Sequence, residues 1–245
     1  MIRTNGVSAR NLRADAFDKL LMAVLSAFNV FSLFYSIKIR NALYALSALA
    51  SLALIFLPDL FEYFLSCRIS YDLKLVYWFL VIGGPVLGNV YKFYHYIRPW
   101  DKLLHMMSGF LAAALGYALP DFLLKEPPKK AFKCIFAVSL SVAIGGIWEI
   151  YEFLLDVLFK MDMQNDTVIT EIASYMLGDV PGTIGEIKSI ESVSINGEPF
   201  ERGYIDIGLI DTMKDMIQCL TGSVLCVITS AFQKPGSRML TIRAI

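Results

Sequence analysis

The sequence predicts an all-α, polytopic membrane protein: a bundle of six transmembrane helices with a small extracytoplasmic cap that contains a short helix and a β-hairpin. Apolar residue types make up 56% of the 245 residues, the mean hydropathy is +0.57, and charged residues reach only 18%. Soluble domains average about 25% charged residues. The apolar residues also gather in six long runs. A helix needs about 20 apolar residues to cross the hydrocarbon core of a bilayer, so these runs are expected to be membrane spans.

The six predicted spans are residues 20–37, 42–57 with an extension as far as 65, 75–91, 103–119, 134–159 and 212–232. Gly83-Gly84-Pro85 predicts a kink in the third span, because proline removes a backbone donor. The connections are short apart from 160–210, and no repeat or low-complexity tract interrupts the chain. We therefore expect one integral membrane domain, residues 1–245, with 160–210 as an insertion.

Charge predicts the orientation and excludes one class of partner. The segments on the N-terminal side of the membrane hold 13 Lys and Arg residues, and those on the other side hold eight. Cytoplasmic loops are enriched in these residues, so both termini are predicted to be cytoplasmic. The 22 basic residues balance 22 acidic ones, and a neutral chain gives no indication of nucleic-acid binding.

The insertion at 160–210 is then extracytoplasmic, and it carries nine acidic and three basic residues. The apolar spacing of residues 167–177 predicts a short amphipathic helix. Residues 189–195 and 198–205 flank Asn196-Gly197, a dipeptide that strongly favours a two-residue turn, so they predict a β-hairpin. The run GDVPGTIG at 178–185 has no lysine, so we interpret it as a turn and not as a phosphate loop.

Ionisable residues inside spans require an explanation, because each costs at least about 2.5–3.5 kcal/mol at the bilayer centre. Seven ionisable residues lie within or at the start of the last three predicted helices, and each helix carries its group on one face: Asp101 and His105; Glu149, Glu152 and Asp156; Asp211 and Asp215. Within each set the residues are three, four or seven positions apart, which is within about 60° around a helix.

The direction of the helices brings these faces to one membrane surface. The fourth span begins where the fifth ends and the sixth begins, so all seven groups are predicted near the extracytoplasmic surface. Lys102 and Lys214 each neighbour an aspartate and are expected to point about 100° away from it. Six buried carboxyls without counter-ions are unstable, so several must be protonated or a cation must lie among them.

The order of these residues resembles that of a known family. Asp-Lys-x-x-His opening one helix, a Glu pair late in the next, and Asp-x3-Asp leading to a glycine are similar to the VanZ-like superfamily and, more closely, to the YjdF-like family of uncharacterised bacterial integral membrane proteins. The resemblance covers about residues 98–226, and its matching positions are Asp101, Lys102, His105, Glu149, Asp211, Asp215 and Gly222. VanZ-like chains tend to have Gln in place of Glu152 and Asn in place of Cys219. The resemblance implies a protein of the bacterial cytoplasmic (inner) membrane with a role in the cell envelope.

Three functions remain open from the sequence. The first is a metal-dependent hydrolase or phosphotransferase acting on a membrane lipid, a lipid-linked compound or another small molecule, with Glu152 and His105 in catalysis. Carboxylates with a single imidazole favour Mg²⁺ or Mn²⁺ over Zn²⁺. The expected metal ligands are Asp101, His105, Glu149, Asp211 and Asp215, with Asp156 as a further candidate. The second is a transporter coupled to protons or cations, and the third is a non-catalytic module that binds lipid or a partner.

Overall fold

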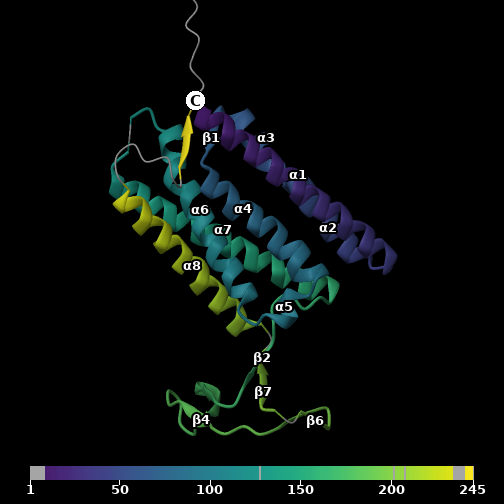
Figure 1. Cartoon of the computed structure of the whole chain (residues 1–245). Helices are drawn as coiled ribbons and strands as arrows, with labels where there is room; N and C mark the ends of the chain where they lie inside the picture. Colours follow the sequence, from purple (N-terminus) through teal and green to yellow (C-terminus); the bar gives the residue numbers. More distant parts are fainter. Residues whose placement is uncertain (1–8, 127, 201, 207, 234–240, 245) are drawn as a thin grey trace, which may run out of the picture. The chain divides into compact units, whose positions relative to one another are not determined.

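The computed structural model describes residues 9–126, 128–200, 202–206, 208–233 and 241–244 (Figure 1). Its helices, in chain order, are α1 Ala9–Lys38, α2 Ala42–Leu54, α3 Leu57–Leu65, α4 Tyr71–Ile82, η1 Gly83–Val90, α5 Phe93–Tyr96, α6 Trp100–Leu123, α7 Lys130–Phe159 and α8 Leu209–Phe232. In this described part of the chain, six helical segments are long and apolar enough to cross a membrane, and they coincide with the six predicted spans. The predicted polytopic helical fold is confirmed.

The chain divides into two compact units. The first comprises residues 1–145 and 217–245, and the second comprises residues 146–216. Helices α7 and α8 each contribute residues to both. Such a division concerns contacts within the chain, so the single membrane domain stays a prediction. Arg3, Lys234 and Arg238, which contribute to the basic-residue count, lie outside the described residues.

In the first unit, α1 packs against α2, α2 packs against η1, and α4 packs against both η1 and α6. The hairpin of α1 and α2 is drawn in purple and dark blue in Figure 1. One apolar cluster is centred on Ile55 and Trp78 between these helices. A second cluster joins Leu73 of α4 to the small residues Ala113 of α6 and Ala137 of α7. Small residues let helix backbones approach closely within a membrane.

The break predicted at Gly83-Gly84-Pro85 is present, but it takes the form of a π-helix. Helix α4 ends at Ile82, and η1 continues it with wider turns. Pro85 has no N–H to donate to the carbonyl of Val81, four residues earlier. The hydroxyl of Ser51, from α2, donates to that carbonyl at 2.8 Å instead. The ring nitrogen of Trp100 likewise donates to the carbonyl of Gly83 at 3.1 Å.

At the junction between α2 and α3, side chains of a neighbouring helix also donate hydrogen bonds to backbone carbonyls. The ring nitrogen of Trp78 donates to the carbonyl of Ile55 at 3.0 Å, and the hydroxyl of Tyr77 donates to the carbonyl of Leu54 at 2.7 Å. Both donors come from α4. Unsatisfied backbone groups are costly in an apolar environment, so side chains from α4 make the interruption between α2 and α3 tolerable.

One buried cation lies where α1, α3 and α4 meet. Lys74 is 4% exposed, and its ammonium group lies 3.4 Å from Asp18, 3.3 Å from Asp59 and 3.2 Å from Glu62. Glu62 also accepts a 2.7 Å hydrogen bond from the backbone N–H of Ile69. Ile69 belongs to β1 Cys67–Ile69, which pairs antiparallel with β8 Ile242–Ala244. This network joins three helices and strand β1 without leaving Lys74 as an isolated charge.

The cap lies in the second unit and consists of strands. β2 Thr167–Ile169 pairs with β7 Tyr204–Asp206, β3 Ile172–Ser174 pairs with β4 Gly185–Ile187, and β5 Val193–Ile195 pairs with β6 Glu198–Phe200. The predicted hairpin is confirmed: Asn196 and Gly197 both have positive φ, at 53° and 89°, as its two-residue turn requires.

The short helix predicted over 167–177 is wrong. These residues form β2, β3 and one 3-10 turn, η2 Tyr175–Leu177. Val168 and Ile169 belong to the ladder with β7, and Ile172 pairs with Ile187 of β4. β-branched residues favour extended backbone when a partner strand is available, and the helical spacing of apolar residues did not reveal those partners.

Substitution of Ser51 tests the compensation at Pro85. We expect Ser51→Ala to lower the free energy of unfolding by about 1–3 kcal/mol, because it leaves the buried carbonyl of Val81 without this donor. Denaturant unfolding in detergent micelles measures the change. Ser47→Ala, on the same helix at a partly exposed position, is the control and should stay within about 0.5 kcal/mol. Equal effects of the two substitutions would contradict a special role for Ser51.

Candidate functional site

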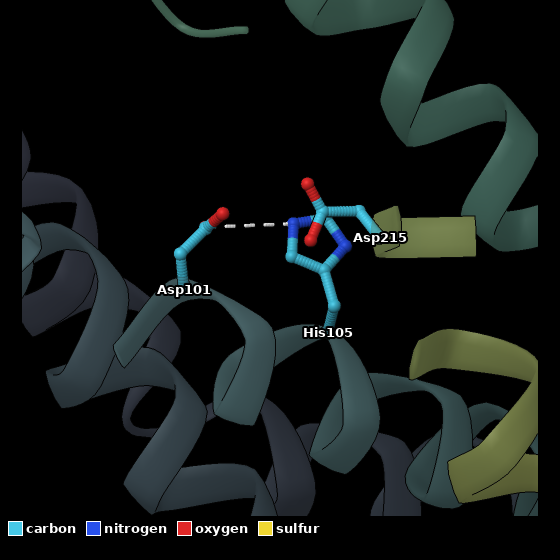
Figure 2. A group of neighbouring side chains, drawn as sticks. All are labelled: Asp101, His105 and Asp215. Atoms are coloured by element: carbon cyan, nitrogen blue, oxygen red, sulfur yellow. Dashed lines mark ion pairs between the residues drawn. The ribbon is translucent and has the colours of Figure 1, made fainter. Parts of the chain in front are cut away.

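The first turns of α6 carry the predicted pair of Asp101 and His105. The Oδ1 atom of Asp101 lies 3.6 Å from Nε2 of His105, one helical turn away (Figure 2). The side chain of His105 is only 9% exposed. The predicted common face of these two residues is confirmed, and the ion-pair geometry fixes which ring nitrogen faces the carboxylate.

The side chain of Lys102 does not point away from Asp101, as the sequence predicted. Its ammonium group lies 3.2 Å from Oδ2 of Asp101, although adjacent helix positions point about 100° apart. The long, flexible lysine side chain bends back over the helix and reaches the carboxylate, which the angle between Cβ directions did not anticipate. Both carboxylate oxygens of Asp101 therefore face a potential cation, Lys102 on one side and His105 on the other.

Glu149 and Glu152 lie three residues apart on α7, and both are buried. The indole nitrogen of Trp148 donates a 2.8 Å hydrogen bond to Oε1 of Glu152. Trp148 is half-exposed, and its ring contacts Tyr151 with a centroid distance of 5.3 Å. The indole thus fixes the orientation of one carboxylate that the sequence analysis assigns to catalysis.

Asp156 and Asp211 bind the segment that follows α7. The two carboxylate oxygens of Asp156 accept hydrogen bonds from the backbone N–H groups of Met163, at 2.7 Å, and Gln164, at 2.9 Å. Oδ2 of Asp211 accepts two hydrogen bonds from Asn165, at 2.9 Å from the backbone and 3.2 Å from the side chain. These contacts hold residues 163–165 against the end of α7 and the start of α8, a structural role that the spacing of acids alone did not indicate.

Asp215 follows Asp211 by one helical turn on α8 and is 1% exposed. It is drawn with Asp101 and His105 in Figure 2. Asp101 and His105 belong to the first unit, and the acids of α7 and α8 named above belong to the second. The structure brings residues together within each unit as described, and the convergence of all seven side chains in one chamber stays a prediction.

Within the first unit, α6, α7 and α8 meet at Gly109, Ser141 and Cys219, which we call the three-helix junction. The hydroxyl of Ser141 donates to the carbonyl of Gly109 at 2.9 Å, and the thiol of Cys219 donates to the carbonyl of Ser141 at 3.6 Å. A Cβ atom at Gly109 would lie 2.1 Å from the carbonyl oxygen of Cys219, and one at Gly222 would lie 1.8 Å from that of Met106. No side chain fits at either glycine, so α6 and α8 touch backbone to backbone.

Ser141 was not among the residues predicted from the sequence to matter for the site. A single serine in an apolar run carries little signal, and its importance depends on the carbonyl of Gly109 opposite it. The thiol of Cys219 also takes part in the hydrogen bonding of the junction. The small size of these residues is the feature of the sequence that could have indicated the junction, because close helix packing in membranes favours small side chains.

We expect Gly→Ala substitutions to raise the free energy of unfolding at Gly146 and to lower it at Gly109 and Gly222. Gly→Ala in a helix normally stabilises by about 0.5–1 kcal/mol, and we expect that gain for Gly146→Ala, where a Cβ meets nothing within 4 Å. At Gly109 and Gly222 the new methyl group collides with backbone, so the free energy of unfolding should fall by about 1–3 kcal/mol. Denaturant unfolding of the three variants measures this contrast. A gain in stability from Gly222→Ala would refute the close contact.

Asp162, in the segment after α7, has a raised pKa because of its partial burial and, to a smaller extent, the negative charges of Asp166, Asp156 and Asp211. A carboxyl whose pKa is raised by folding stabilises the fold below its ordinary pKa, and this contribution is lost as the pH rises through the raised value.

We therefore expect Asp162→Asn to increase the protection of the amides of residues 163–165 from hydrogen exchange at pH values above the raised pKa of Asp162. Below that pKa the substitution should change the protection little. Hydrogen exchange measured across pH and corrected for intrinsic rates tests this. Asp179→Asn, at an exposed acid of the cap, is the control. The same change in both variants would show that the pH-dependent protection of these amides does not come from Asp162.

Comparison with known proteins identifies the family. Residues 18–235 match the family described as "Predicted membrane protein (DUF2238)". An uncharacterised protein from Thermotoga maritima is 26% identical to the chain over 144 residues, which are 59% of this chain and 73% of that protein. No solved structure shows a significant match. With its six apolar spans, the chain is a multi-pass membrane protein and belongs to the DUF2238 family.

Proposed function

We propose that the Asp101–His105 pair of α6 and the buried acids of α7 and α8 form one divalent-metal site near the extracytoplasmic surface of a bacterial inner membrane. At this site the protein acts as a hydrolase or phosphotransferase on a membrane lipid or a lipid-linked envelope compound. The observation that carries the proposal is the three-helix junction, because it fixes the relative level of α6, α7 and α8 close to these residues.

Helix geometry extends the junction to the acids of α6 and α8. His105 and Asp215 each precede their junction residue by four positions, which is about 6 Å along a helix. Asp101 and Asp211 each precede it by eight positions, or about 12 Å. Both helices start from the same membrane surface, because one full span and a connection separate them. The two pairs are therefore expected at matching heights, one and two turns from a place where the helix backbones touch.

The same reasoning applies to α7, which runs in the opposite direction. Glu149 and Glu152 follow Ser141 by eight and eleven positions, or about 12 and 16 Å. Eleven positions return a helix to within about 20° of the starting direction, so Glu152 shares the face of Ser141 that meets α6 and α8. This supports a common chamber for the carboxyls of three helices.

The donor set suits a hard divalent cation. Two sets of three side chains offer such a combination: Asp101, His105 and Asp215, drawn in Figure 2, and His105, Glu149 and Glu152. Several carboxylates with one imidazole favour Mg²⁺ or Mn²⁺. When bound, such an ion supplies Lewis-acid catalysis and activates water.

The remaining acids have distinct roles in this proposal. Glu152, oriented by Trp148, is the candidate general base, with His105 as a second proton-transfer group. Asp211 is both a candidate ligand and the acceptor for Asn165, and a second hydrogen-bonded partner is typical of carboxylate ligands. Asp156 uses both oxygens on backbone amides, so it supports the site by holding the loop.

A lipid or lipid-linked substrate fits the surroundings of Glu152. Trp148 and Tyr151 are each about half-exposed beside it on α7, and such amphipathic rings concentrate at membrane interfaces. The resemblance to YjdF-like and VanZ-like chains also favours a role in the cell envelope. A substrate dissolved in the membrane would reach this face of α7 laterally.

Transport is the second candidate, because α4 continues as the π-helix η1. π-helical turns often occur at functional sites, and interrupted spans commonly line the paths of transported solutes. In this alternative the same carboxyls exchange protons or bind a transported cation, and no substrate is chemically changed.

Metal binding tests the proposal directly. We expect the purified protein to bind about one Mn²⁺ per chain in equilibrium dialysis, and Glu149→Gln and Asp215→Asn to weaken this binding at least about 10-fold. The matched control is Glu62→Gln, which removes a buried carboxylate from the Lys74 network and should leave the Mn²⁺ affinity unchanged.

The other outcomes separate the alternatives. Proton uptake or release that accompanies solute movement in proteoliposomes and is abolished in the same two variants, without Mn²⁺ binding, would favour transport. If Glu149→Gln and Asp215→Asn only lower stability, as Glu62→Gln is expected to do, the carboxyls serve the fold and the proposed metal site is wrong.

A further inference from the structure

The cap has two hairpins on opposite sides of the β2–β7 ladder, one formed by β3 and β4 and the other by β5 and β6 (Figure 1). Residues 175–184, which connect β3 to β4, form what we call the cap tip. Its apolar side chains face outward: Met176 is 94% exposed, Tyr175 68%, Val180 59% and Ile184 57%. Apolar side chains gathered in this way on a folded surface indicate an interaction site.

The backbone of the cap tip holds these side chains outward. Val180-Pro181-Gly182-Thr183 forms a tight turn with a 3.0 Å hydrogen bond from the N–H of Thr183 to the carbonyl of Val180, and Gly182 has a φ of 85°. A Cβ atom at Gly178 would lie 2.1 Å from the carbonyl oxygen of Thr183. This compact loop leaves no interior into which the exposed side chains can turn.

Charge is distributed unevenly along the same hairpin. At its open end, Lys188 forms ion pairs with Glu186 at 2.7 Å and Glu171 at 3.8 Å. Between residues 175 and 184 the sequence holds one charged residue, Asp179, and no cation. The hairpin is therefore apolar at the tip and charged at the base, as in segments that lie partly in a membrane interface.

The bilayer is the partner that this chemistry fits. The cap connects the end of α7 to the start of α8, and both helices are long and apolar enough to be membrane spans, so the cap is joined at both ends to helices that cross the bilayer. Aliphatic side chains with a tyrosine suit the boundary between headgroups and acyl chains. The lack of Lys and Arg excludes attraction to anionic headgroups as the main force, which leaves burial of apolar surface.

We propose that the cap tip inserts into the interface of the bilayer that the protein spans and so anchors the extramembrane cap. This inference is independent of the proposed metal site, because it depends only on the surface of residues 175–184. Insertion of such apolar side chains to a depth of about 5–10 Å is typical of interfacial segments.

Spin labels in nanodiscs of phosphatidylcholine and phosphatidylglycerol test the insertion on the full chain. Met176→Cys and Val180→Cys place a nitroxide at the tip, and Ser194→Cys places one at an exposed position of β5. The unsubstituted protein reports any labelling of its native cysteines. The measurement compares collisions with oxygen, which concentrates in lipid, and with a water-soluble nickel complex.

We expect labels at positions 176 and 180 to collide more with oxygen than with the nickel complex, and a label at 194 to show the reverse. Tip labels that behave like the label at 194 would show that the tip is in water and would overturn the proposal. Tip labels shielded from both reagents would overturn it too, because the tip would then be covered by protein. Circular dichroism confirms that each variant is folded.

Discussion

The close contact of α6 with α8 is the constraint on which the rest of the first unit depends. Gly109 and Gly222 leave no room for even a Cβ atom, so the two backbones touch, and Ser141 of α7 binds the carbonyl at the contact point. Lipid provides no hydrophobic force that drives helices together, so such packing and polar contacts must hold the bundle. A residue larger than glycine at either position would force the two backbones apart where they touch.

A second constraint acts on the backbone where helices are interrupted. Hydrocarbon offers no water to satisfy a free carbonyl, and this chain breaks its second and third spans at Ile55 and Gly83. At both breaks, side chains from neighbouring helices donate to the exposed carbonyls: Trp78 and Tyr77 at the first, Ser51 and Trp100 at the second. The aromatic donors also fill the core, so one residue satisfies a polar group and packs an apolar gap. The hydroxyl of Tyr77 and the ring nitrogens of Trp78 and Trp100 therefore lie at the two helix breaks.

The sequence predicts those features that depend on one segment at a time. Hydropathy summed over about 20 residues identified the six spans, and helical periodicity paired Asp101 with His105. Features that depend on a partner segment were missed or mistaken. Residues 167–169 pair with β7 and residues 172–174 pair with β4. Asp156 and Asp211 bind backbone amides of a loop, and Lys102 bends towards Asp101 because its side chain is long. Apolar spacing and Cβ directions contain no information about such partners.

The second unit combines the cap and the acid-bearing helix ends in one connected structure. Asp156 and Asp211 fix the loop after α7 to both helices, and the side chain of Asp206, at the end of β7, accepts a hydrogen bond from the N–H of Ile210 in the first turn of α8. Through these contacts, restraint of the cap is also restraint of the helix turns that carry Glu152 and Asp215. In the proposed metal site, carboxyls that share a cation would have to be held within about 0.5 Å of the required geometry, and short hydrogen bonds to a loop would help to provide that order. In the proposed site, Asp156 and Asp211 near the helix ends would help to position the more deeply buried Glu152 and Asp215.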